Sequence, residues 1–201
     1  MSTRVDSLHV MSESLHALRG SPRKPSGVRL AMEALHSKHE GIQSLGVGLL
    51  GEWADPTFVP ELRELLQAVS ARPRSSGLRR VVIRALARCV SEADAPWVLA
   101  YCFDAAGERQ RQEGIALVCA LPHKVTAARI VLECRSQRVE LRRAAVQAVS
   151  VLPVAQQEPL SHRLVRDGDS SVRAYARYQL GRMGSSEPPN PSSHRTRYAG
   201  R

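Results

Sequence analysis

The chain has 201 residues, of which 43% are hydrophobic and only 4% aromatic, so its core must be filled by alanine, leucine and valine. These residue types favour an all-α chain over a β-sandwich or β-barrel. The formal net charge of +10 permits binding to polyanions but does not by itself identify a partner.

The first 27 residues are predicted to form a capping helix and a linker. Residues 4–18 place Val5, Leu8, Leu15 and Leu18 along one side of a helix. The next segment, 19–27, contains two prolines and two glycines, which predicts a linker that attaches this helix loosely. The N-terminus lacks the apolar core of a signal peptide, and no apolar run reaches the roughly 18 residues of a membrane span. We therefore expect a cytoplasmic protein without a membrane span.

Helical patterns resume at Val28–His36 and at Ile42–Trp53. Gly46, Gly48 and Gly51 lower the helix propensity of the second segment by roughly 1 kcal/mol each relative to alanine. We interpret these glycines as sites of close approach between helices. Another helix is expected over Val59–Val69, and residues 71–77 are predicted to form a turn.

An internal repeat of helix pairs emerges when five segments are aligned without gaps. Their first core residues are Ile42, Leu78, Gln110, Leu141 and Val172, and the steps between them are 36, 32, 31 and 31. The intervening first helices are predicted at Pro96–Phe103, Val125–Cys134 and Ala155–Val165. A repeat of this length that holds two helices is the signature of an α-solenoid, in which each pair buries its apolar face against its neighbours.

The clearest copy of the repeat is LVRDGDSSVRAYARYQLGRMG, residues 164–184. Asp169 and Ser170 are good N-cap residues, and an apolar stripe that includes Val172 and Tyr175 follows them. The order of Asp, two small polar residues, Val-Arg, small residues at helical spacing and Leu-Gly resembles the second helix of a short HEAT-like repeat of the PBS-lyase type. This resemblance covers about residues 28–184. It implies an all-α, right-handed α-solenoid of about five HEAT-like helix pairs.

Neither a metal site nor a cofactor is predicted. Cys89, Cys102, Cys119 and Cys134 are widely spaced within predicted helices, which indicates buried reduced thiols. His36 and His39 have helical spacing, but no cysteine or acidic cluster completes a metal-ligand set. Residues 185–201 are rich in Pro and Ser and almost without apolar side chains, which predicts a disordered basic tail.

One group of arginines shares a single phase of the repeat. It consists of Arg79, Arg111, Arg142 and Arg173. This is the arginine position of the HEAT-like pattern, and the resemblance implies contacts between neighbouring turns. The resemblance also implies that this arginine pairs with an acid in the preceding turn, and here only Asp169 stands four residues before its arginine, Arg173. Because a flanking arginine can donate to carbonyls of the adjacent turn, we interpret these five residues as a structural ladder.

A second group is predicted to lie on the other side of the second helices. At 100° per residue, Arg80 and Arg84 project opposite the buried stripe that contains Leu78. Arg143, Arg177 and Tyr178 join this group. Since second helices line the concave side of HEAT solenoids, the resemblance implies that these five residues bind a partner in the groove. A plain solvated face is the alternative, and the excess of arginine also fits GC-rich coding.

These patterns predict a non-catalytic scaffold or adaptor that binds an acidic protein. Nucleic acid is the alternative partner, and the alkylpurine DNA glycosylases are small, basic HEAT-like solenoids whose groove combines a catalytic Asp with aromatic and Arg residues. Here Trp53 and Trp97 fall at core or helix-start positions and Asp104 is a turn acid, so no catalytic residue is assigned. The bilin lyases also use short HEAT-like repeats, but no motif distinguishes a lyase here. The sequence does not specify an oligomeric state.

Overall fold

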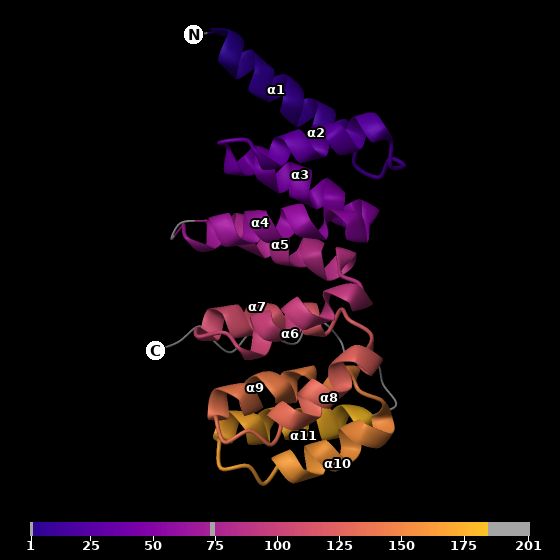
Figure 1. The fold of residues 1–201 in the computed structure, drawn as a ribbon, viewed down its shortest axis with the longest axis vertical. Coiled ribbons are helices and arrows are strands. Elements are labelled where there is room, and N and C mark those ends of the chain that lie inside the picture. The colour runs from indigo at the N-terminus through magenta and orange to yellow at the C-terminus, as the bar shows by residue number, and fades with distance from the viewer. Residues whose placement is uncertain (1, 73–74, 185–201) are drawn as a thin grey trace. The chain divides into compact units, whose positions relative to one another are not determined.

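A computed structural model describes residues 2–72 and 75–184, with side chains from Ser7 onward. Within these residues the chain is helical and contains no strand (Figure 1). The α-helices are α1 (Ser2–Ala17), α2 (Pro25–Leu35), α3 (Glu40–Trp53), α4 (Val59–Ser70), α5 (Ser76–Cys89), α6 (Ala95–Phe103), α7 (Glu108–Val118), α8 (His123–Glu133), α9 (Val139–Ala148), α10 (Val154–Leu164) and α11 (Ser170–Gly184). Single 3-10 turns precede α4 and α6 and follow α9. Among the described residues, no helix is long and apolar enough to cross a membrane.

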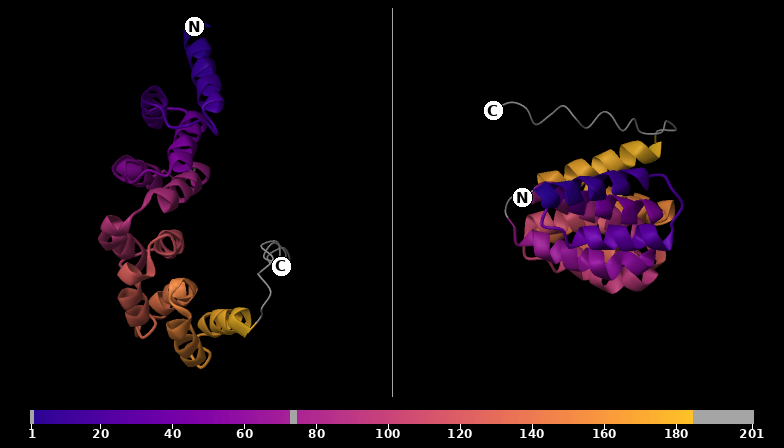
Figure 2. Two further views of the ribbon diagram at one scale, coloured as in Figure 1. Left: turned by 90° about the vertical axis from the view of Figure 1, so that its right-hand side faces the viewer. Right: turned by 90° about the horizontal axis from the view of Figure 1, so that it is seen from above.

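The helices belong to two compact units, residues 1–126 and 127–201, which we describe separately. In the first unit, α2–α3, α4–α5 and α6–α7 form consecutive pairs, and the second helices α3, α5 and α7 pack against one another in that order. In the second unit, α11 packs against α9 and α10. The boundary falls within α8. Figure 2 shows the pairs from two further directions.

The predicted repeat register is confirmed. The second helices begin at residues 40, 76, 108, 139 and 170, which reproduces the predicted steps of 36, 32, 31 and 31. The core positions predicted for α9 are all buried, from Leu141 through Ala145 to Leu152. The chain is therefore an all-α helical-repeat protein with five helix pairs, α2–α3 to α10–α11.

The N-terminal helix is attached more firmly than its linker suggests. Leu15 on α1 is fully buried. In the linker, Arg19 Nε lies 3.3 Å from a carboxylate oxygen of Glu52, and the Trp53 indole donates to the carbonyl of Ser21 at 3.2 Å. The expected loose attachment is thus not observed, because polar residues at the end of α3 bind the linker backbone and side chains.

Two of the three glycines predicted as sites of close approach on α3 do permit it. A Cβ atom at Gly46 would lie 2.7 Å from the carbonyl oxygen of Ala31 on α2, and one at Gly51 would lie 2.9 Å from the Cα of Ala85 on α5. The prediction is wrong for Gly48, since no atom lies within 4 Å of the position its Cβ would take.

We expect opposite effects from alanine at two of these glycines. Gly46→Ala should lower the free energy of unfolding by about 1–2 kcal/mol, because the new methyl group overpacks against the α2 backbone. Gly48→Ala should raise it by up to about 1 kcal/mol, since alanine is the better helix former in open space. Urea denaturation followed by circular dichroism measures both. Equal shifts in the same direction would mean that α2 and α3 are further apart than described.

Two details of burial differ from the sequence predictions. Cys89, Cys102 and Cys134 are buried as expected, but Cys119 is exposed because it follows the last residue of α7. Tyr175, predicted in the core stripe, is 42% exposed, because α11 packs against α9 and α10 and no further helix follows it within the described residues. The predicted tail, residues 185–201, lies outside the described residues.

Candidate functional site

Three of the four in-phase arginines bind backbone carbonyls in the loop before their own helix. These hydrogen bonds join Arg111 to Ala105, Arg142 to Ser136 at 2.9 Å and Arg173 to Asp167 at 2.8 Å. The acceptor lies six residues before the arginine each time, so donor and acceptor both follow the 31-residue period. Each guanidinium donates a hydrogen bond to a loop carbonyl that has no partner within a helix, and this bond holds the loop against the second helix.

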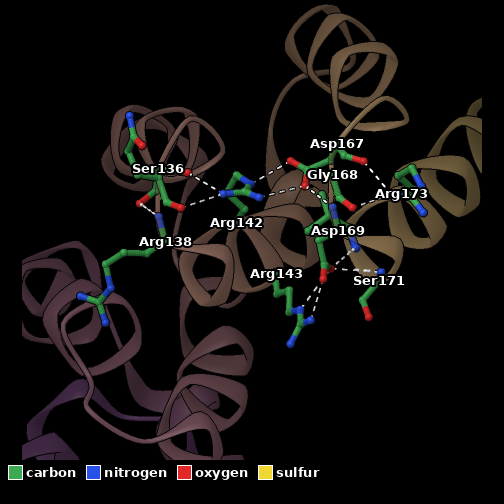
Figure 3. A network of polar contacts seen from close by, with 11 residues as sticks. Ser136, Arg138, Arg142, Arg143, Asp167, Gly168, Asp169, Ser171 and Arg173 are labelled. Carbon is green, nitrogen blue, oxygen red and sulfur yellow. Dashed lines mark hydrogen bonds and ion pairs between the residues drawn. The ribbon is translucent and has the colours of Figure 1, made fainter.

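Arg142 extends this contact to the next helix pair. Its guanidinium binds both carboxylate oxygens of Asp167, in the loop between α10 and α11, at 2.8 and 3.0 Å (Figure 3). The backbone N–H of Asp169 also donates to Asp167 at 2.9 Å. The hydrogen bonds from Arg142 hold the pKa of Asp167 below its usual value, so the pair stays charged at neutral pH.

Asp169 does not take the partner that the family pattern implies. Instead of Arg173, it binds Arg143 on α9 through two contacts of 3.1 and 2.6 Å. The same carboxylate accepts hydrogen bonds from the backbone N–H groups of Ser171 and Val172, which confirms Asp169 as the N-cap of α11. The hydrogen bonds from Arg143 lower the pKa of Asp169 to about 2. Arg173 instead donates to the carbonyls of Asp167 and Gly168, in the loop before α11 (Figure 3).

Arg79 forms a different network, within the first unit. It is 8% exposed, and its Nε and Nη2 atoms lie 2.8 and 2.6 Å from one oxygen of Glu113 on α7. The hydroxyl of Tyr101 on α6 donates to the same oxygen at 3.1 Å, and burial raises the pKa of Tyr101 to about 12. The sequence offered one signal for this partner: Glu113 occupies a position of the buried stripe of α7, where a charge requires a counter-charge.

The exposed arginines of α5 lie where the sequence predicts them. Arg80 and Arg84 are exposed one turn apart, and neither guanidinium has an ion pair or hydrogen bond within the described residues. The neighbouring second helices hold small or neutral residues at the equivalent positions. We call this surface the α5 face, and it consists of Ser44 and Gly48 on α3, Arg80 and Arg84 on α5, and Gln112 and Ala116 on α7.

The other three predicted partner residues lie in the second unit. Arg143 is paired with Asp169, which neutralises its charge, although its side chain remains 41% exposed. Arg177 and Tyr178 are exposed on α11, and the guanidinium of Arg182 lies 5.9 Å from the centre of the Tyr178 ring. Arg80 and Arg84 thus share a helix, whereas Arg143 belongs to a different polar network.

The residues considered for an enzyme make internal contacts. The Trp97 indole donates to Asp94 at 3.3 Å and lies beneath the guanidinium of Arg63, while Trp53 binds the linker. Asp104 is exposed after α6. These residues do not line the cavity between α2 and α4 or either of two cavities in the second unit. Among the described residues, no group of three or more His, Cys, Asp or Glu side chains is arranged to hold a metal ion.

Comparisons with known proteins find similarity only among solved structures. No protein-family model and no curated protein matches the chain. An engineered protein is 16% identical over 87% of this chain, with a TM-score of 0.41, and the chain spans 51% of that protein's length. A designed armadillo repeat protein is 14% identical over 85% of this chain and 86% of its own, with a TM-score of 0.39. A second one, in complex with the peptide (KR)4, is 13% identical over 88% and 90% of the two chains, with a TM-score of 0.42. The helical-repeat fold is assigned from the chain's own five helix pairs.

Proposed function

We propose that this protein is a non-catalytic binding module of the cytoplasm that holds an acidic segment of another protein on the α5 face. The supporting observation is that Arg80 and Arg84 have no ion-pair partner and lie on α5, the central helix of the three adjacent second helices α3, α5 and α7. An acidic side chain of the partner would gain a charge-assisted hydrogen bond from each guanidinium. In the second unit, Arg143, Arg177 and Tyr178 are proposed as further contacts.

The surroundings of the two arginines favour a protein over a nucleic acid. Gly48 faces open space and Ala116 is small and exposed, so a partner's backbone can approach the helices closely. A phosphate backbone is bound by arrays of basic residues, whereas the equivalent positions on α3 and α7 are neutral. One turn further along, α5 carries a third exposed arginine, Arg88, and the neighbouring helices carry Glu52 and Glu108. Because acids flank the guanidiniums, the surface is not a continuous basic array, and it fits one or two carboxylates better than a polyanion.

Photo-cross-linking from the α5 face tests this function. A benzoylphenylalanine at Ala116 should cross-link one discrete protein in native lysate, and nuclease treatment should leave that product unchanged. The same probe at Gln67, which is exposed on α4, is the matched control and should not give this product. A nucleic-acid adduct at Ala116, or a protein adduct that disappears with nuclease, would contradict the proposal and favour a nucleic-acid-binding module.

A further inference from the structure

Arginine side chains gather around a cavity in the second unit, which is distinct from the α5 face and includes Arg142 and Asp167. The cavity has a volume of about 870 Å³ and lies between the loop after α8 and the C-terminal end of α10, a size typical of ligand sites. Its charged or titratable lining residues are Arg135, Arg142, Arg163, Arg166, His162, Asp167 and Cys134. We call it the arginine pocket.

The one acid of the arginine pocket does not neutralise most of its arginines. Asp167 is occupied by both nitrogens of Arg142 and by a backbone N–H, and Arg142 also donates to the carbonyls of Ser136 and Gln137 (Figure 3). Arg135, Arg163 and Arg166 are exposed, and none of their guanidiniums has an ion pair or hydrogen bond within the described residues.

These unpaired arginines differ from two other arginines of the second unit. Arg129 and Arg143 in the same unit each bind an acid, at 2.7 and 2.6 Å. The guanidiniums of Arg163 and Arg135 both lie close enough to the Cys134 thiol to oppose the burial that raises its pKa to about 12. The pocket therefore brings three guanidiniums together, and none of the three is paired with an acid.

An apolar groove continues from the arginine pocket. It has a volume of about 570 Å³ between α8 and α10, and Ala128, Val131, Pro159 and Leu160 are among its lining residues. Arg135 and Arg163 line both spaces, so the groove opens beside the charged pocket. Leu132 and Val154, on the same two helices, are 62% and 63% exposed. A ligand that fits both spaces carries an anion next to an apolar group.

We propose that the arginine pocket and the α8–α10 groove together bind a phosphorylated segment of a partner protein, with the phosphate in the pocket and a neighbouring apolar side chain in the groove. A phosphate monoester carries nearly two negative charges and three strong acceptor oxygens, which matches several guanidiniums better than a single carboxylate does. Arginine also has the planar, bidentate geometry that suits phosphate.

Other occupants fit this site less well. The chain's own residues 185–201 contain three arginines and one glutamate, so they would be repelled by the pocket. A second copy of this basic chain is disfavoured for the same reason. A nucleic-acid backbone would meet the arginines but would leave the apolar groove uncovered. The proposal concerns a different surface from the α5 face and stands independently of the proposed function.

A peptide library with a fixed central phosphoserine tests the site on the full chain. Selection should enrich apolar residues beside the phosphoserine. In fluorescence anisotropy, the best peptide should bind about tenfold or more tightly than its serine and glutamate versions, and inorganic phosphate should compete with it. The Arg163→Ala, Arg166→Ala double variant should lose this tenfold preference for the phosphopeptide. Ala128→Asp should abolish the preference for an apolar residue beside the phosphoserine.

The matched control is Arg138→Ala, because Arg138 is exposed in the same loop, does not line the pocket and points away from Arg142 (Figure 3). It should leave the affinity unchanged. Circular dichroism would verify the fold of each variant, and Arg163→Lys, which keeps the charge but not the bidentate geometry, should also weaken binding. Equal affinity for the three peptide versions would overturn the proposal. Tighter binding of single-stranded RNA that depends on the same arginines would overturn it too, in favour of a polyanion surface. Either result leaves the cross-linking test at Ala116 unaffected.

Discussion

Replacing Glu113 by glutamine should destabilise the first unit by about 3–5 kcal/mol, because it leaves a buried guanidinium without its counter-charge. The side chains of Arg79 and Glu113 are only 10% and 14% exposed, and their atoms approach to 2.6 Å. Glutamine keeps the shape of the side chain and one carbonyl acceptor. A loss of stability would therefore come from the missing negative charge and not from a cavity in the core.

Tryptophan fluorescence during urea denaturation measures this loss in the first unit, because Trp53 and Trp97 both belong to it. Arg109→Ala is the matched control, since Arg109 contacts the same carboxylate at 3.3 Å from a side chain that is 57% exposed. Removing this exposed ion pair should lower the free energy of unfolding by less than about 1 kcal/mol. If Glu113→Gln costs no more than Arg109→Ala, the link from α5 to α7 does not depend on a buried ion pair.

Leu164→Ala should cost about 2–5 kcal/mol in the second unit, the range for removing a large aliphatic side chain from a packed core. Leu164 is 2% exposed at the end of α10. The change removes three buried carbon atoms and leaves a cavity beside the loop that carries Asp167.

The midpoint of urea denaturation, followed by circular dichroism, measures this effect. Leu132→Ala provides the comparison, because Leu132 is 62% exposed on α8 and its truncation should change stability by no more than about 0.5 kcal/mol. An unchanged midpoint for Leu164→Ala would mean that the repeat register in the second unit is incorrect.

The register of the helices was predictable because the same physical pattern recurs. Each second helix repeats small and apolar residues at helical spacing, so a weak segment such as that around Gln110 could be located by its distance from Leu141. The exposure of Arg80 and Arg84 followed from the same phase. Periodicity fixes which side of a helix is buried, and these predictions needed no knowledge of distant contacts.

The partners of the charged residues were not predictable in this way. Asp169 was expected to bind Arg173, four residues along, but it binds Arg143 on another helix. The carbonyl acceptors of the ladder are backbone groups, which carry no sequence signal of their own. The arginine pocket forms where two loops and the end of α10 meet, so its residues share no motif. Side-chain partners across helices depend on tertiary geometry that a single sequence does not contain.

The central claim is that Arg80 and Arg84 serve binding and not folding. The most direct test uses the partner identified by cross-linking at Ala116, purified, and measures its affinity for the Arg80→Glu, Arg84→Glu double variant. The control is Arg29→Glu with Lys38→Glu, which makes the same change in net charge at exposed residues away from the α5 face. We predict that the first variant loses about tenfold or more in affinity with an unchanged melting temperature, and that the control binds like the wild type. Equal affinities for the two double variants would contradict the claim.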